Sequence, residues 1–141
     1  MLPDASDIQL LTQVGFLAAG RGDVSRALRI FEALALLRPD HAFAFVGLAS
    51  ALMNAGQANE AVQRLQAVKL PTGPEADMLD SFRGLALQLA GRHGESRFLL
   101  RQIVARSRHA RASEGVLLAS RLLGEDLGAA PRPAALYASS F

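Results

Sequence analysis

The feature that most constrains the fold is a pattern that occurs three times, with the second copy 34 residues after the first and the third 35 residues after the second. Each copy has an apolar run at helical spacing, a glycine-containing break, and a second apolar run. The aligned positions are Gly22, Gly56 and Gly91; Ala27, Ala61 and Ser96; and Phe31, Leu65 and Leu100. Apolar residues at this spacing predict two helices joined by a tight turn in every copy. Because one helical hairpin cannot bury its apolar face alone, three copies predict a stack of hairpins.

Capping residues, glycines and prolines predict where the first helices begin and end. In the first copy we expect Ser6 or Asp7 to cap a helix that ends at Gly20. Asp23 is placed to cap the second helix, and Pro39 stops it because the residue before a proline is disfavoured in helix. The later helices are expected over 42–54, 58–69, 75–90 and 95–108, with a helix-free break at 70–74.

These elements predict one domain over residues 1–127 followed by a tail. Its repeats fall at about 8–41, 42–75 and 76–109, and residues 110–124 predict a helix that covers the last exposed apolar face of the stack. Residues 128–141 are rich in Pro and Ala, so we expect a flexible tail. Its apolar residues Leu136, Tyr137 and Phe141 could dock into the groove that such a stack forms, in the same or a neighbouring molecule.

Composition narrows the class of protein and its compartment. Of the 141 residues 50% are hydrophobic, which is enough for a globular core, and Cys is absent. No apolar run approaches the roughly 18 to 20 residues of a membrane span. The N-terminus lacks a basic region followed by an apolar one, so we expect no signal peptide and a cytoplasmic location.

Charge is spread unevenly along the chain. Residues 1–82 hold 6 Lys/Arg and 9 Asp/Glu, and residues 83–141 hold 9 and 4, so the second half is the basic one. A basic half is compatible with nucleic acid. However, these basic residues are dispersed between apolar positions, and the formal net charge of the whole chain is only +2. We therefore expect no nucleic-acid partner.

Catalytic and metal-binding patterns are lacking. His41, His93 and His109 lie far apart, and none has a carboxylate or a second His at ligand spacing. The glycine-rich segments 20–23 and 91–94 follow no predicted strand and lack the Lys-Ser/Thr ending of a phosphate loop. The sequence therefore predicts a protein that is not an enzyme and has no metal or cofactor.

The repeated unit resembles the tetratricopeptide repeat over residues 8–108. That family places a small residue where two helices cross, and the matching positions are Gly15, Ala49 and Gly84. The other aligned positions also fit, whereas the proline near the end of the unit occurs only as Pro39. The resemblance implies an all-α fold of three such hairpins in a right-handed superhelical solenoid with a C-terminal capping helix.

A narrower resemblance is to the small three-repeat chaperones of bacterial type III secretion, and thus to a virulence apparatus. It is carried by the short chain, by residues 16–41, and by the Phe-Val-Gly-Leu-Ala-Ser-Ala segment at 45–51. It implies a cytoplasmic bacterial chaperone that keeps an extended segment of a secreted or export-apparatus subunit soluble. The translocator chaperones carry an additional N-terminal helix that can dimerise, and this chain is shorter there. The resemblance therefore leaves open whether the chain forms a homodimer or a heteromeric chaperone complex.

In this fold the first helix of each hairpin lines a concave groove. The inward positions are Gln9, Thr12, Phe16, Phe43, Val46, Ser50, Met53, Met78, Ser81, Leu85 and Leu89. This set is mostly apolar, and the family members that grip an acidic C-terminal tail instead carry Lys, Asn and Arg in the groove. The expected client is therefore an extended apolar segment. Ordinary core packing is the alternative for these residues, and an adaptor that binds through its convex or basic C-terminal face is the alternative function.

Overall fold

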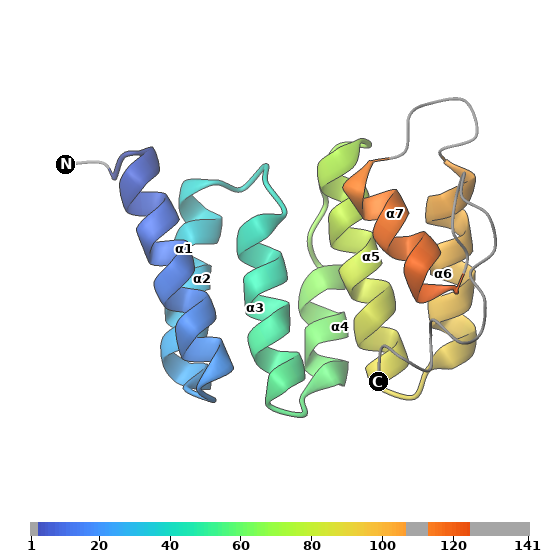
Figure 1. Ribbon diagram of the computed structural model, residues 1–141, viewed down its shortest axis with the longest axis horizontal. Helices are drawn as coiled ribbons and strands as arrows, with labels where there is room; N and C mark the ends of the chain where they lie inside the picture. Colours follow the sequence, from blue (N-terminus) through green and yellow to red (C-terminus); the bar gives the residue numbers. More distant parts are fainter. Residues whose placement is uncertain (1–2, 107–112, 125–141) are drawn as a thin grey trace, which may run out of the picture.

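The computed structural model describes residues 3–106 and 113–124, and this part of the chain is entirely helical (Figure 1). Its helices are α1 (Ala5–Gly20), α2 (Val24–Leu37), α3 (Phe43–Asn54), α4 (Ala58–Gln66), α5 (Pro74–Leu89), α6 (His93–Ala105) and α7 (Glu114–Leu122). The predicted all-α solenoid is confirmed. The predicted tail at 128–141 lies outside the described residues.

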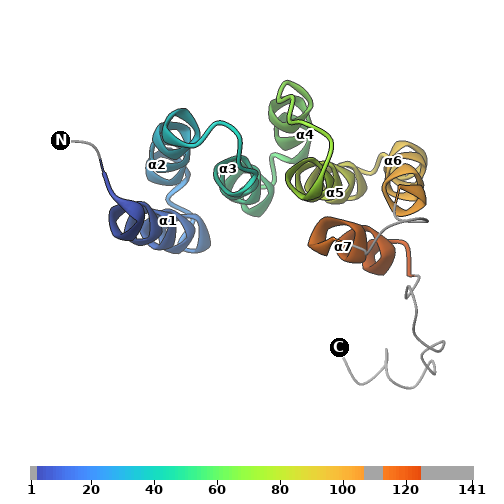
Figure 2. The same ribbon diagram turned by 90° about the horizontal axis from the view of Figure 1, so that it is seen from above.

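The helices stack as consecutive antiparallel pairs. α1 packs on α2, α3 on α4, and α5 on α6, while α3 also contacts both helices of the first pair. Seen from above, α2 and α4 form an outer row, and α1 and α7 stand at the two ends of an arc that α3 and α5 complete (Figure 2). The inner side of this arc is the concave side of the molecule.

The three turns within the hairpins confirm the repeat. Gly22, Gly56 and Gly91 have φ values of 78°, 76° and 78°, respectively. Only glycine adopts this left-handed backbone without strain, so the same residue closes the turn in each copy.

Several helix boundaries differ from the predicted ones. Asp4, rather than Ser6 or Asp7, caps α1, because its side chain accepts from the Asp7 N–H while Asp7 accepts from the Asp4 N–H. α5 begins inside the segment predicted to be helix-free, since Pro74 occupies its first position, where a proline needs no N–H partner. α4 ends at Gln66, three residues early, and α6 begins two residues earlier than expected.

Small residues bring the helices of each hairpin close together. Phe31 is fully buried, and a Cβ atom at Gly15 would come within 2.8 Å of its ring. A Cβ atom at Gly84 would likewise collide with the buried side chain of Leu100 on α6. The small side chain of Ser96 lies close to Gly84, and its hydroxyl donates a hydrogen bond to the Gly84 carbonyl at 2.7 Å. The predicted crossing positions Gly15 and Gly84 are therefore confirmed as sites of close approach.

α7 packs against α5 and α6 and covers the end of the stack, as predicted for the capping helix. Gly115 lies directly on the α5 backbone at Asp77 and Met78. The Ser81 hydroxyl donates to the Gly115 carbonyl at 2.5 Å, and the Gln88 amide donates to the Leu122 carbonyl at 3.2 Å. Within residues 3–106 and 113–124, no helix combines the length and apolar character that a membrane crossing requires.

Candidate functional site

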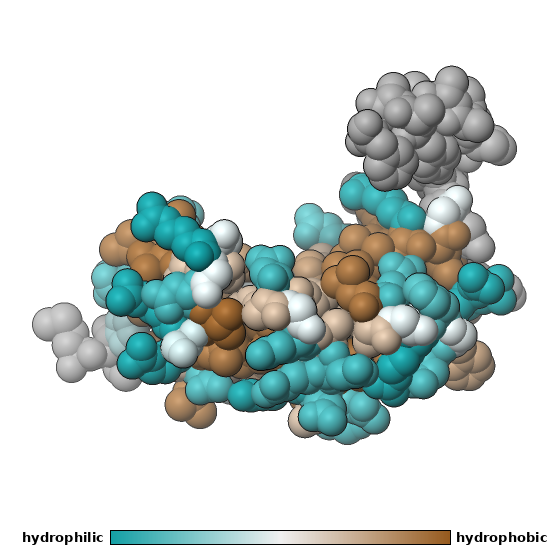
Figure 3. All heavy atoms as spheres, turned by 90° about the horizontal axis from the view of Figure 1, so that it is seen from below, coloured by the Kyte–Doolittle hydropathy of each residue, from teal (hydrophilic) through white to brown (hydrophobic). Residues whose placement is uncertain are grey.

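A pocket of about 450 Å³ opens on the concave side, where α1, α3, α5 and the start of α7 meet. Six of its nine lining residues are apolar and come from α1, α3 and α5 or the residue just before α3, whereas the three polar ones come from α5 and the start of α7. The lining residues are Phe16, Ala42, Phe43, Val46, Pro74, Glu75, Met78, Ser113 and Glu114. The space-filling view shows the hollow in profile between the end formed by α1 and the end formed by α7 (Figure 3).

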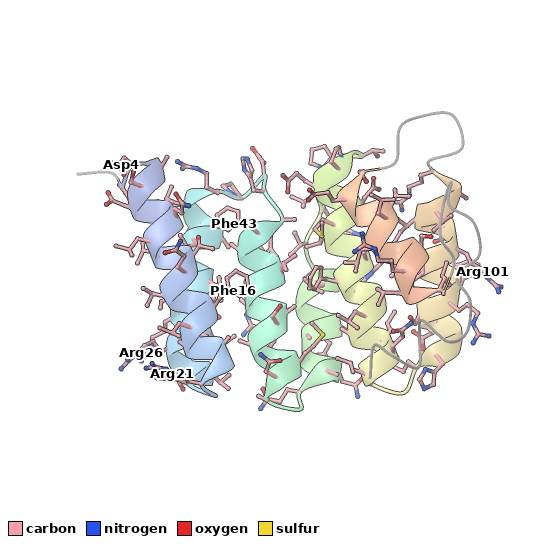
Figure 4. The ribbon with its side chains drawn as sticks, viewed as in Figure 1. Asp4, Phe16, Arg21, Arg26, Phe43 and Arg101 are labelled. Atoms are coloured by element: carbon pink, nitrogen blue, oxygen red, sulfur yellow. The ribbon has the colours of Figure 1, made fainter. Side chains whose placement is uncertain are left out.

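The pocket unites four of the residues predicted to face inward: Phe16, Phe43, Val46 and Met78. Phe16 is the most open of them, with 42% of its surface exposed. Phe43 and Met78 are half-buried, whereas Val46 is nearly buried and forms part of the floor. Figure 4 shows Phe16 and Phe43 where α1 and α3 lie side by side.

Neighbouring rings hold these aromatic side chains in place. The ring of Phe16 meets the buried ring of Phe31 edge-on, with 4.9 Å between centroids. Phe43 stands 6.3 Å from the imidazole of His41, also edge-on. Both contacts have the geometry that aromatic pairs prefer. These contacts orient both rings at the pocket wall.

The prediction that Ser81 faces the groove is wrong. Ser81 is fully buried because its hydroxyl bonds to Gly115 and α7 lies over it, so its side chain does not reach the concave surface. The register placed it on the correct side of α5, but the capping helix covers that position.

The other predicted groove residues lie outside the pocket. Thr12 and Ser50 are half-buried, and their hydroxyls donate to the carbonyls of Ile8 and Val46 in their own helices. Met53 packs against the core. The remaining three lie on α1 or α5 without lining the pocket, with Gln9 exposed, Leu85 half-buried and Leu89 exposed beside the turn at Gly56.

The polar part of the pocket was not predicted. Glu75 accepts a hydrogen bond from the Ala42 N–H at 2.6 Å, so it ties the start of α5 to the start of α3. Ser113 and Glu114 come from α7, and Glu114 is exposed. The 33-residue separation of Ala42 and Glu75 is close to the repeat length and could have paired them. No comparable signal placed α7 beside the pocket.

The lining supports binding by burial of apolar groups. None of the lining residues is a lysine or arginine, so the pocket lacks the cations that hold a carboxylate. In the described part of the chain, no cluster of three or more His, Cys, Asp or Glu could hold a metal ion. Apolar walls with two carboxylates suit an apolar peptide segment without acidic groups.

A second apolar pocket, of about 370 Å³, lies on the convex side between α2, α3 and α4. Leu36 stands at its edge with 84% of its surface exposed, and Phe45, Leu48 and Val68 form its walls. An ion pair of 3.2 Å between Glu32 and Arg64 borders it.

Residues 18–79, from the end of α1 to the first part of α5, match a family model described as Tetratricopeptide repeat. No curated protein and no solved structure matches the chain.

Proposed function

We propose, since the chain is an all-α solenoid of the tetratricopeptide-repeat type, that it binds an apolar segment of a partner protein in its concave pocket. The observation that carries this proposal is the presentation of Phe16, Phe43 and Met78 to one open pocket by three successive hairpins. Each apolar side chain that a partner buries there contributes about 1 to 2 kcal/mol. The chain acts by holding another polypeptide and performs no reaction on it.

A narrower form of the proposal is that the partner is a subunit of a type III secretion apparatus, held soluble in the bacterial cytoplasm before export. Its support is the sequence resemblance over residues 16–51 together with a groove suited to an apolar client. By binding the client reversibly, the chain would lower the concentration of free, aggregation-prone subunit. Co-expression with secretion subunits encoded beside its gene tests this form, which fails if none of them becomes more soluble.

A second candidate function is that of an adaptor whose partner binds the convex side. The observation in its favour is the apolar pocket beside Leu36, which is nearly as large as the concave one. A leucine exposed over 84% of its surface gains free energy when a partner covers it.

Substituting one exposed apolar residue at a time separates the two functions. Peptides selected from a random display library against the wild-type chain provide the probe, and calorimetry measures their affinity. We expect Phe16→Glu to weaken binding by about tenfold or more, because a carboxylate would replace the ring in an apolar wall. Phe98→Glu is the matched control, since Phe98 is 67% exposed on α6, away from the concave pocket.

Leu36→Glu tests the convex alternative with the same peptides. Unchanged affinity in Leu36→Glu together with loss in Phe16→Glu supports the concave pocket. The reverse pattern overturns it in favour of the adaptor. Melting curves of all three variants establish that each still folds.

A further inference from the structure

A further apolar surface lies on α1, away from both the concave and the convex pocket. Asp7, Leu10, Val14, Leu17 and Arg21 follow one another at steps of 3, 4, 3 and 4 residues, which places them along one stripe of the helix. We call these five residues the α1 seam. Leu10 and Leu17 expose 60% and 55% of their surface, and Val14 exposes 39%.

The α1 seam belongs neither to the core nor to the groove. The buried residues of α1 are Ile8, Gly15, Ala18 and Ala19, and Phe16 is the residue that enters the pocket. Among the described elements α1 contacts only α2 and α3. Figure 1 shows α1 at the end of the stack opposite α7, and Figure 3 shows hydrophobic residues gathered at this end.

The two ends of the solenoid therefore differ. α7 covers one end, whereas the seam leaves apolar side chains open to water at the other. A terminal unit in a repeat stack normally has a polar outer face. A narrow apolar stripe with steps of 3 and 4 residues is the pattern by which one helix packs lengthwise against another.

The charges at the two ends of the α1 seam indicate which helix would pack against it. Asp7 stands at the start of the seam and Arg21 at its end, and Figure 4 shows Asp4 and Arg21 at opposite ends of α1. Within the described residues Arg21 has no ion-pair partner, and the exposed Asp7 binds only the backbone N–H of Asp4. An antiparallel copy of α1 would bring each Asp7 opposite an Arg21, whereas a parallel copy would place like charges together.

We propose that two copies of this chain associate through the α1 seam, with the two α1 helices antiparallel about a two-fold axis near Val14. Asp7 and Arg21 are each seven residues from Val14, so such an axis aligns them with one another. An isologous interface of this kind is the commonest in homo-oligomers. Its small area predicts a weak dimer, and both concave pockets stay open because they lie on another side of α1.

Disulfide trapping tests the axis directly, because the chain has no cysteine of its own. Val14→Cys places one thiol next to its equivalent across the axis, and mild oxidation should convert most of the protein to a covalent dimer. Leu36→Cys, an exposed position on α2, is the matched control and should stay monomeric. Equal cross-linking of the two variants would overturn the proposal.

Sedimentation across a concentration series tests the interface without a cross-link. We expect the wild-type chain to associate reversibly and Leu10→Glu/Leu17→Glu to stay monomeric with an unchanged far-ultraviolet circular dichroism spectrum. Leu36→Glu, which makes the same change outside the seam, should associate as the wild type does. A wild-type chain that is monomeric throughout overturns the proposal and leaves the seam to a different polypeptide.

A charge exchange tests the antiparallel orientation. Arg21→Glu should weaken the dimer by about tenfold, because it replaces two attractive pairs by two repulsive ones. Adding Asp7→Lys to Arg21→Glu should recover most of this loss. Arg29→Glu is the control, since Arg29 is exposed on α2 outside the seam. No recovery in the double variant, when its melting curve matches that of Arg21→Glu, would rule out this orientation.

Discussion

At the scale of single residues, glycines decide how closely the hairpins approach. The repeat spacing identified Gly15 and Gly84, because each lies where the two helices of one pair cross. Gly47 was not identified as a crossing residue, although a Cβ atom there would overlap the buried ring of Phe31. Phe31 thus lies between a glycine of its own hairpin and a glycine of the next one, a relation that the spacing within one repeat does not report.

We expect Gly47→Ala to lower the free energy of unfolding by about 1 to 3 kcal/mol, because the added methyl group collides with the Phe31 ring. Urea unfolding measures this change. Gly94→Ala is the matched control: a Cβ atom there meets nothing within 4 Å, so higher helix propensity should leave α6 as stable or slightly more so. Equal destabilisation in both variants would contradict the packing argument.

At the scale of elements, a buried carboxylate joins three helices. Asp77 is only 8% exposed on α5, and it pairs with Arg106 at the end of α6 at 3.2 Å. It also accepts a hydrogen bond of 2.9 Å from the hydroxyl of Ser113, which caps α7. Because Ser113 lines the pocket, Asp77 positions the part of the site that α7 contributes.

Replacing Asp77 by Ala should cost about 2 kcal/mol of stability, since it leaves the Ser113 hydroxyl without its acceptor and removes a partly buried ion pair. Asp80→Ala removes the more exposed partner of Arg106 and should cost less than about 1 kcal/mol. Chemical denaturation compares the two variants. If Asp80→Ala proves the more destabilising, Asp77 does not hold the three helices together.

At the scale of the whole molecule, the apolar pocket and the basic second half of the chain favour different kinds of partner. The groove is apolar and has no lysine or arginine in its lining, whereas the second half of the chain is basic overall. Binding that depends on apolar burial does not release counterions. Binding to nucleic acid does, so its affinity falls steeply as salt rises.

We therefore expect the affinity for an apolar peptide to change by less than about threefold between low and moderate salt, because few charges take part. Fluorescence anisotropy with a labelled peptide and with labelled single- and double-stranded oligonucleotides measures both kinds of binding. Tight oligonucleotide binding that weakens steeply with salt would favour the basic half as the functional surface.

Much of the architecture could be predicted because it depends on local patterns. Apolar spacing located the helices, Gly22, Gly56 and Gly91 located the turns, and Pro39 marked the end of a hairpin. The errors arose where two local signals competed. Pro74 was interpreted as a helix breaker although it starts a helix, and Asp4 outcompeted Ser6 and Asp7 as the cap of α1.

The sequence by itself determined that this chain is a stack of helical hairpins, and it predicted an inward direction for Phe16, Phe43, Val46 and Met78, because the repeat period gives equivalent residues equivalent directions. Only the tertiary structure decided that Ser81 is covered and that Ser113 and Glu114 complete the pocket. It also showed that the α1 seam is left open. These outcomes depend on where α7 packs, and contacts between helices separated by tens of residues leave no local pattern in the chain.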